Sequence, residues 1–464
     1  MTDPGTDILA ETQSLCPECL RQIPAYRRLE ESSVFLEKRC PEHGLSKTII
    51  WRGHPCIQGW SRPKMPSNPD RPATSIDRGC PFDCGLCPDH RQHTCTALLE
   101  VTHRCNLMCR ICFAGSGRPA SPDPGAKMIR FWYDRVLESA GTCNIQLSGG
   151  EPTVRNDLPA IIHVGKQAGF SFIQLNTNGI RIAEETEYAE KLKDAGLASV
   201  FLQFDGISDA PYLALRGRPL ADLKKRAVEA CARSGLGIVL VPTLVPGINT
   251  DQIGTILNYG LSEAPAVRGV HFQPVSYFGR YPKPPQDSER ITLPEVMAAL
   301  ERQTQGKVRA DQFRPPGCEN ALCSFHGNFI ILESGRLVAL TDRNGSCCIG
   351  PEKAEDGARQ TISAVARNWS GPVGNPVNSP NPESCLEPVS DSPSPCECDT
   401  LDGFLDRART HTFGISAMAF QDAWTLDLER LRDCCIHVVA PDGRLIPFCA
   451  YNLTSRSGRG LYRS

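Results

Sequence analysis

Three cysteines, Cys105, Cys109 and Cys112, stand on one short stretch of chain with the spacing C-x3-C-x2-C. Thiolates at this spacing can ligate three irons of a cubane [4Fe-4S] cluster, whereas full ligation by protein usually takes four cysteines. The fourth iron is then left for a small molecule. The cysteines follow residues 96–102, a run typical of a buried strand, so they are expected on a loop at the end of that strand.

A zinc knuckle is the alternative interpretation of these cysteines, but it requires paired C-x2-C units with a fourth Cys or His. A second motif weighs against it. The strand-like run 144–148 leads straight into Gly149, Gly150 and Glu151. Glycines let the backbone approach a ligand closely, so its carbonyls can accept hydrogen bonds from an ammonium group, and Glu151 adds a negative charge.

Together the cysteine loop and the Gly-Gly-Glu segment resemble the radical S-adenosylmethionine (SAM) superfamily. The resemblance implies that Cys105, Cys109 and Cys112 hold the catalytic cluster and that its open iron chelates SAM. Electron transfer would then cleave SAM to give a 5'-deoxyadenosyl radical, while the Gly-Gly-Glu segment binds the methionine amine. Many loops of the superfamily carry an aromatic residue just before the third cysteine. Here Ile111 precedes it, and Phe113, which follows, is expected on the adenine side.

Strand-like and helix-like runs alternate between residues 96 and 278. The strand-like runs are 96–102, 144–148, 172–176, 199–204, 237–244 and 269–274, and the helix-like runs include 155–169, 184–196, 220–235 and 250–263. Alternation of this kind indicates parallel strands with right-handed crossovers. The sequence therefore predicts an α/β fold with a partial (β/α)6 barrel, whose ligands lie at the carboxyl ends of the strands.

Four polar residues follow the third and fourth predicted strands. They are Asn176, Asn178, Gln203 and Asp205. They match the positions at which the superfamily contacts the ribose and carboxylate of SAM. Each could instead be an ordinary turn residue.

The N-terminal cysteines have the spacing of a small metal-binding ribbon. Cys16 and Cys19 form a C-x2-C pair, and Cys40 and His43 form a C-x2-H pair twenty residues later. Four such ligands predict one mononuclear zinc or iron site of the zinc-ribbon or rubredoxin-like type, without deciding between the metals.

A second group repeats the cubane spacing. Cys80, Cys84 and Cys87 follow the C-x3-C-x2-C pattern, and Cys95 follows within a few residues. Four thiols would ligate all four irons, so this auxiliary cluster would transfer electrons or be structural. The proline-rich run 63–77 before it has no strand pattern, which is why the SAM site is assigned to the later cysteines.

Cysteines in the C-terminal part are well separated, as in radical SAM subfamilies that build an auxiliary cluster near the substrate. The favoured ligands are Cys318, Cys323, Cys435 and Cys449. The adjacent pairs Cys434/Cys435 and Cys347/Cys348 leave open which member ligates. Cys385, Cys396 and Cys398 fall in a Pro/Ser/Asn-rich insertion at about 370–399, and Cys56, Cys143 and Cys231 are expected to be packing residues.

The overall composition fits an intracellular metal protein. The 464 residues carry 23 cysteines and a net charge of −2, which argues against a general nucleic-acid binder. No signal peptide or apolar run long enough to span a membrane is present, so we expect a cytoplasmic protein whose cysteines bind metal rather than form disulfides. Peripheral contact with a membrane stays open.

The motif order over about residues 16–455 resembles the archaeal tetraether lipid synthase family and its relatives, some of which are assigned pterin methylation. The domains expected are a metal-binding knuckle at 1–60, an auxiliary-cluster segment at 61–95, the barrel at 96–280 and a SPASM-like auxiliary-cluster region at 281–464. The resemblance also implies two auxiliary [4Fe-4S] clusters and a flavodoxin- or ferredoxin-type electron donor.

Three functions remain open at this point. The first is a radical enzyme that acts on an inert C–H bond of a lipid chain and forms a C–C bond. The second is a SAM-consuming transferase that moves a methyl or 3-amino-3-carboxypropyl group to a pterin or another small acceptor. The third is an electron-transfer Fe-S protein without catalysis, which the intact cysteine loop and Glu151 disfavour. A long apolar tunnel would indicate a lipid, and a compact polar pocket a heterocycle.

Overall fold

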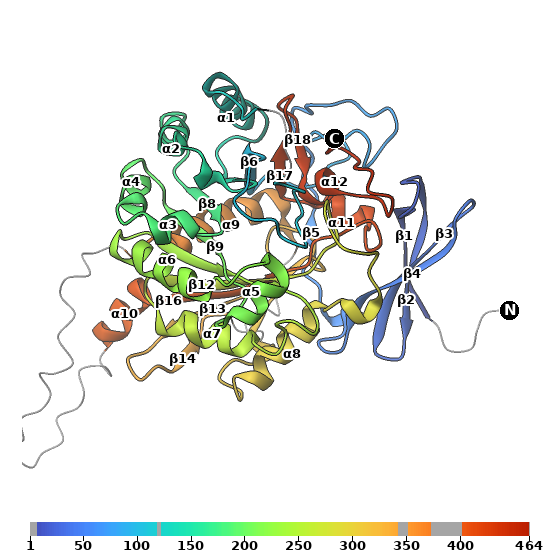
Figure 1. Cartoon of the computed structure of the whole chain (residues 1–464). Coiled ribbons are helices and arrows are strands. Elements are labelled where there is room, and N and C mark those ends of the chain that lie inside the picture. The colour runs from blue at the N-terminus through green and yellow to red at the C-terminus, as the bar shows by residue number, and fades with distance from the viewer. Residues whose placement is uncertain (1–6, 118–121, 342–350, 373–400, 464) are drawn as a thin grey trace, which may run out of the picture.

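The computed structural model describes residues 7–117, 122–341, 351–372 and 401–463. Cys347, Cys348, Cys385, Cys396 and Cys398 lie outside the described residues. The chain begins with an antiparallel sheet in the order β1-β2-β3-β4, which lies at one end of the molecule (Figure 1). Its strands are β1 (Asp7–Leu15), β2 (Gln22–Glu30), β3 (Ser33–Cys40) and β4 (Gly44–Arg52).

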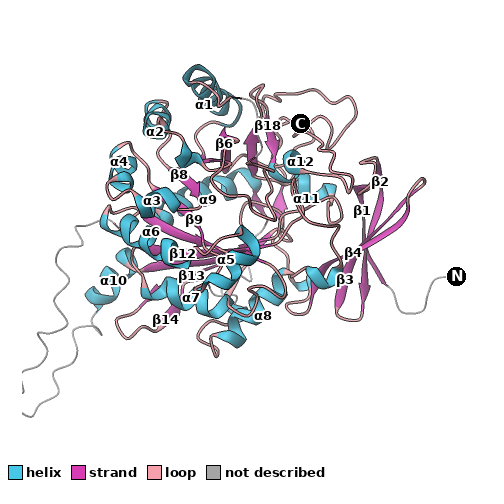
Figure 2. Cartoon of the chain, viewed as in Figure 1, coloured by secondary structure: helices cyan, strands magenta, loops and turns pink. Residues whose placement is uncertain are grey.

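The predicted barrel is present, with all six strands close to the expected positions. The strands, which pair in parallel along the sheet, are β6 (Thr96–Thr102), β7 (Asn144–Gly149), β8 (Ile173–Thr177), β9 (Ser199–Gln203), β10 (Gly237–Val241) and β12 (Val267–Pro274). Helices cover the outer face of this sheet (Figure 2). They are α1 (Ala126–Ala140), α2 (Leu158–Gln167), α3 (Ile180–Glu184), α4 (Tyr188–Asp194), α5 (Asp209–Arg216), α6 (Ala221–Arg233) and α7 (Ile253–Ser262).

Strands from the C-terminal part extend the barrel sheet at both edges, which the sequence did not predict. Beyond β12 lie β16 (Thr412–Met418), β13 (Ser324–Ile331) and β14 (Leu337–Ala339), and beyond β6 lie β17 (Ile436–Val439) and β18 (Leu445–Pro447). β16 and β17 run parallel to their barrel neighbours, so the C-terminal part contributes directly to the barrel wall.

One C-terminal helix, α9 (Ala354–Trp369), packs against β10, β12 and β16. In Figure 1 it lies behind the barrel strands, apart from the outer helices. The remaining helices and short strands are β5 (Lys64–Met65), β11 (Thr243–Leu244), β15 (Glu352–Lys353), α8 (Leu293–Gln303), α10 (Leu401–Thr410), α11 (Leu428–Arg432) and α12 (Phe448–Asn452), with 3-10 turns at Ile57–Gly59, Pro152–Val154, Asp287–Glu289 and Ala310–Gln312.

Buried polar contacts attach the N-terminal sheet to the C-terminal part. Lys38 is fully buried, and its Nζ donates to Ala423 O at 2.7 Å and to Ser14 Oγ at 3.0 Å. Arg27 pairs with the buried Asp427 at 2.6 Å. In the described part of the chain, every helix is too short or too polar to cross a bilayer.

Candidate active site

The loop with Cys105, Cys109 and Cys112 leaves the carboxyl end of β6 and lines a large cavity. Arg280, just after β12, fixes its shape. The backbone N–H groups of Cys112 and Arg280 donate to each other's carbonyl at 2.9 and 3.0 Å. The guanidinium donates to Cys109 O at 2.9 Å and to Ser116 O at 2.8 Å. The loop is therefore held across the barrel, from the first strand to the last predicted one.

The chemistry of these three side chains fits an iron-sulfur cluster. Burial raises the pKa of the Cys105 thiol to about 12, so at neutral pH this residue would be protonated without a positive partner. Bound iron supplies that positive charge and deprotonates coordinating thiols. The other two cysteines are half-buried and face the same cavity.

Gly149 and Gly150 are required because the strand end approaches the cysteine loop. A Cβ at Gly149 would lie 2.2 Å from Thr102 O, and one at Gly150 would lie 2.1 Å from Arg104 O. Gly149 also has φ +118°, which L side chains rarely adopt. From the motif we expect both glycines to let the backbone approach a ligand, and both line the cavity. The structure adds a second requirement for glycine, because the chain's own backbone lies where the two Cβ atoms would be.

We expect Gly150→Ala to displace the cysteine loop, because the added methyl group collides with backbone rather than with a movable side chain. Overpacking of this kind costs about 1–3 kcal/mol. Both the thermal unfolding midpoint and the iron content after anaerobic reconstitution should fall. Gly125→Ala is the matched control, because nothing lies within 4 Å of its added Cβ. Equal iron content in the two variants would contradict the packing argument.

Glu151 is 1% exposed and ties the ends of β7 and β8 together. Its Oε1 accepts from Thr153 Oγ1 at 2.7 Å and from Thr177 Oγ1 at 2.6 Å, while Oε2 accepts from Asn178 N at 2.7 Å. The Asn178 side chain in turn donates to Asn106 Oδ1 on the cysteine loop at 2.7 Å. Glu151 and Asn178 therefore position the loop, and both line the cavity.

Asn176 and Gln203 also line the cavity, whereas Asp205 does not. Asp205 is fully buried and accepts two hydrogen bonds from Arg216, at 2.7 and 2.8 Å. This placement contradicts the expected contact of Asp205 with SAM. Burial alone would lower the pKa of Arg216, but the Asp205 carboxylate and the nearby Cys109 thiol raise it, so the guanidinium stays charged beside a cluster ligand.

Asp205→Ala should be strongly destabilising, because it leaves Arg216 charged and buried without its partner. Removing one member of a buried ion pair costs about 3–5 kcal/mol. The double variant Asp205→Ala with Arg216→Leu should recover much of that loss in chemical unfolding. Asp222→Ala breaks an exposed pair with Arg226 and is the control, with an expected effect below about 1 kcal/mol. A double variant as unstable as the single one would contradict the ion-pair explanation.

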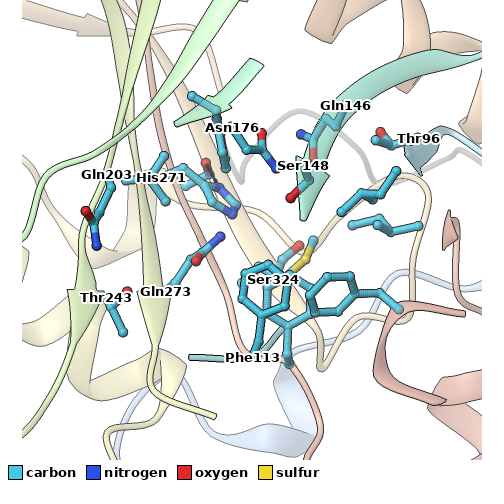
Figure 3. Close-up of a pocket in the computed structure, with 18 of the residues that line it drawn as sticks. Thr96, Phe113, Gln146, Ser148, Asn176, Gln203, Thr243, His271, Gln273 and Ser324 are labelled. Carbon is cyan, nitrogen blue, oxygen red and sulfur yellow. Dashed lines mark hydrogen bonds between the residues drawn. The ribbon is translucent and has the colours of Figure 1, made fainter. Parts of the chain in front are cut away.

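The cavity has a volume of about 630 Å³ and is lined by residues of the barrel strands, the cysteine loop and α9. Figure 3 shows polar side chains from β7, β8, β9 and β12 around this space, with Phe113 at one side. The labelled ones are Gln146, Ser148, Asn176, Gln203, His271 and Gln273. Phe113 contacts Phe448, with ring centroids 5.5 Å apart. The volume is in the range of small-molecule sites.

Comparison with known proteins decides the family. Residues 99–260 match the model of the radical SAM superfamily, and residues 8–52 match that of the HMPTM N-terminal zinc ribbon domain. The 7,8-dihydro-6-hydroxymethylpterin dimethyltransferase of Methanocaldococcus jannaschii is 35% identical over 96% of this chain and 94% of its own length. The chain belongs to the radical SAM superfamily, in the family of this dimethyltransferase.

Other relatives of this radical SAM protein match a smaller part of it. The mitochondrial GTP 3',8-cyclase of Arabidopsis thaliana is 29% identical over 38% of the chain and 45% of its own length. The crystal structure of Streptococcus suis SuiB is 16% identical, covers 47% of the chain and 46% of its own, and has a TM-score of 0.37. Membership in the superfamily makes the protein an enzyme and implies a [4Fe-4S] cluster and SAM as its cofactors.

In the radical SAM protein, the four predicted N-terminal ligands lie together. Cys16, Cys19, Cys40 and His43 have their ligand atoms within 4.8 Å of one another. Cys40 Sγ lies 3.4 Å from His43 Nδ1, and Cys16 Sγ lies 3.7 Å from it. The first pair lies in the turn between β1 and β2, and the second in the turn between β3 and β4. This geometry suits one tetrahedral metal ion.

Cys95 does not lie with Cys80, Cys84 and Cys87, as the sequence analysis expected. Its sulfur lies within 4.8 Å of those of Cys318 and Cys435. Cys95 and Cys318 are bonded as a disulfide with Cα atoms 7.5 Å apart, beyond the usual span of about 4.4–6.8 Å. A third buried thiol at this short distance indicates a group of metal ligands rather than an ordinary disulfide.

The other auxiliary cysteines among the described residues lie outside the group of Cys95, Cys318 and Cys435. Cys80, Cys84 and Cys87 surround a separate small pocket, together with Asp89 and His90. Cys323 and Cys449 are not gathered with Cys318 and Cys435 into one four-ligand set, which corrects the predicted grouping. Burial raises the pKa of the Cys434 thiol, and the charges of Cys449 and Cys323 raise it further.

The sequence did not lead us to expect the roles of Arg280 and Arg216 at the site, or a helix at the position of α9. Arg280 had no motif to mark it, although its place just after the last predicted strand puts it on the same rim as the cysteine loop. Arg216 carried no signal, because its partner Asp205 was assigned to the ligand. Cys143 and Cys231 are buried in the core, as expected of packing residues, whereas Cys56 is exposed.

Proposed function

We propose that this protein is a radical SAM methyltransferase whose acceptor is a reduced pterin. The observation that carries the proposal is the similarity to the pterin dimethyltransferase, because it extends over nearly the full length of both chains. The cavity supports the same class of acceptor. Amide, hydroxyl and imidazole side chains line it, and these can pair with the polar edge of a heterocycle.

A lipid chain, the first choice of the sequence analysis, finds no support in these observations. An alkyl chain offers nothing to Gln146, Asn176 or Gln203, and burying their amides against it would cost free energy. The alternative of a pterin acceptor is therefore the one we retain.

The cofactors would be held at the rim of the barrel. Cys105, Cys109 and Cys112 would ligate the [4Fe-4S] cluster, and the Gly-Gly-Glu segment, Asn176, Asn178, Gln203 and Phe113 would face SAM. When bound, the cluster and SAM supply a 5'-deoxyadenosyl radical that removes a hydrogen atom from the acceptor. Arg280 holds the loop, and Lys224 donates to Gln203 Oε1 at 3.1 Å and so orients that amide.

The other cysteine groups would hold auxiliary iron-sulfur clusters, and the N-terminal ribbon one zinc or iron ion. A flavodoxin- or ferredoxin-type protein would supply the electrons. Cys95 and Cys435 line the same cavity as Cys105, so an auxiliary cluster there would lie beside the bound substrate.

The test is anaerobic turnover of the reconstituted protein with reductant, SAM and 7,8-dihydro-6-hydroxymethylpterin. We expect 5'-deoxyadenosine together with a methylated pterin detected by mass spectrometry. SAM labelled in its methyl group tells whether the new carbon comes from a second SAM or from another one-carbon donor in the extract. Production of 5'-deoxyadenosine without any pterin product, also in the presence of cell extract, would reject the pterin as acceptor.

A further inference from the structure

The cavity extends from the cysteine loop to the far side of the barrel, where α9 closes it. One face of α9 lines the cavity at intervals of three or four residues, with Gly357, Gln360, Ala364 and Asn368 along it. Residues three and four apart share one side of a helix. Trp369 stands at the end of this face.

The end of α9 is fixed to the barrel strands. Arg268 Nε, on β12, donates to Asn368 O at 3.0 Å. A Cβ at Gly237, the first residue of β10, would lie 2.2 Å from Trp369 O, so only glycine allows this approach. Trp369 is therefore held in place by the Arg268 side chain of β12 and by the backbone of β10 before any ligand binds.

Three rings form a continuous wall at this end of the cavity. Phe201 on β9 lies 5.4 Å from His271 on β12 and 5.6 Å from Trp369. The rings of His271 and Trp369 are 6.2 Å apart. All three residues line the cavity, and Figure 3 shows the His271 side chain directed into it, near Asn176.

Polar groups border this wall. His271 Nδ1 contacts Ser416 Oγ at 2.8 Å, and burial lowers the pKa of His271 to about 4, so its imidazole is neutral at pH 7. A neutral imidazole offers one donor and one acceptor. Asn328 and Asn368 also line the cavity.

We propose that the wall of Phe201, His271 and Trp369 is the binding site for the flat ring of the acceptor, whose polar edge pairs with the neighbouring amides and hydroxyl. This inference rests on the proposed function. A planar bicyclic ring buries its face against aromatic side chains, and such stacking is tolerant of the ring's substituents. SAM would occupy the opposite end, beside the cysteine loop, so one cavity brings the two molecules together.

The experiment measures binding of 7,8-dihydro-6-hydroxymethylpterin to the reconstituted protein by anaerobic equilibrium dialysis, with SAM present. Trp369→Leu should weaken binding about tenfold, the scale of one lost aromatic stack. Trp369→Phe keeps an aromatic face and should stay within about threefold of the wild type. Cleavage of SAM in the absence of pterin should be unchanged in both variants.

A second variant, Gly414→Leu, tests the same site in case Trp369→Leu fails to fold. A Cβ at Gly414 would lie 3.6 Å from Trp369 Nε1 without a clash, so Gly414→Leu adds bulk in front of the wall and should also weaken binding. Wild-type affinity in both Trp369→Leu and Gly414→Leu would overturn the site while leaving the proposed function intact. A wild-type protein that cleaves SAM but binds no pterin would instead reject the proposed function and, with it, this inference.

Discussion

We expect the replacement of Cys105, Cys109 and Cys112 together by alanine to abolish the cleavage of SAM. The three thiols are the only cysteines on the loop that leaves β6, and Arg280 holds that loop at the cavity rim. Without them the iron that binds SAM has no ligands on the loop that Asn178 and Glu151 position. We expect no 5'-deoxyadenosine above background and a loss of about four irons per chain.

The control is Cys143→Ala with Cys231→Ala, which removes two thiols buried in the hydrophobic core. That variant should lose some stability but keep its iron and its cleavage activity. The readouts are iron and sulfide analysis and chromatography of 5'-deoxyadenosine under dithionite. Residual cleavage in the triple variant would mean that another group, such as that of Cys80, Cys84 and Cys87, binds SAM.

The barrel could be predicted from the sequence because its signals are local. Each predicted strand ends within about three residues of the end of the observed strand. The cysteine loop and the Gly-Gly-Glu segment follow the carboxyl ends of their strands, where a parallel sheet places ligands. The helix before β8, α2, ends at Gln167, and Gly169 just beyond it has φ +101°, the left-handed conformation that glycine after a helix predicts.

The C-terminal contribution could not be predicted, because it depends on contacts between distant segments. β17 pairs in parallel with β6 although more than three hundred residues separate the two strands. β16 likewise pairs in parallel with β12, which lies far before it in the sequence. Short strands such as Ile436–Val439 carry a signal no stronger than many loops. The interior position of α9 is likewise invisible in its sequence, since an amphipathic pattern does not reveal which surface the helix faces.

The same long-range pairing explains why the cysteine groups were assigned incorrectly. Ile436 lies opposite Thr96 in the parallel pairing of β17 with β6, so the residues just before the two strands, Cys435 and Cys95, become neighbours. Cys95 N donates to Cys435 O at 2.8 Å. Spacing along the chain assigned Cys95 to the nearer cysteines, whereas strand register assigns it to Cys435.

The register of β17 against β6 predicts which cysteine variants lose iron together, and the spacing of the cysteines along the chain predicts the opposite result. If Cys95, Cys318 and Cys435 hold one cluster, each single alanine variant loses the same four or so irons, and Cys95→Ala with Cys435→Ala loses no more than either alone. Cys95→Ala with Cys80→Ala, in contrast, loses two clusters, because its members belong to different groups. The measurement is iron per chain, supported by the electron-resonance spectrum of the reduced protein.

The outcome also decides the chemical state of Cys95 and Cys318. A structural disulfide would leave Cys435 as an isolated buried thiol, so Cys435→Ala would keep the full iron content, and thiol titration of the denatured wild type would find two thiols missing. In that alternative Cys435 would be a neutral thiol that donates to Glu319 Oε2 at 3.6 Å, because burial and the nearby carboxylate raise its pKa. We expect the shared loss of iron rather than the disulfide, because the Cα atoms of Cys95 and Cys318 are 7.5 Å apart and the sulfur of Cys435 lies within 4.8 Å of both of their sulfurs.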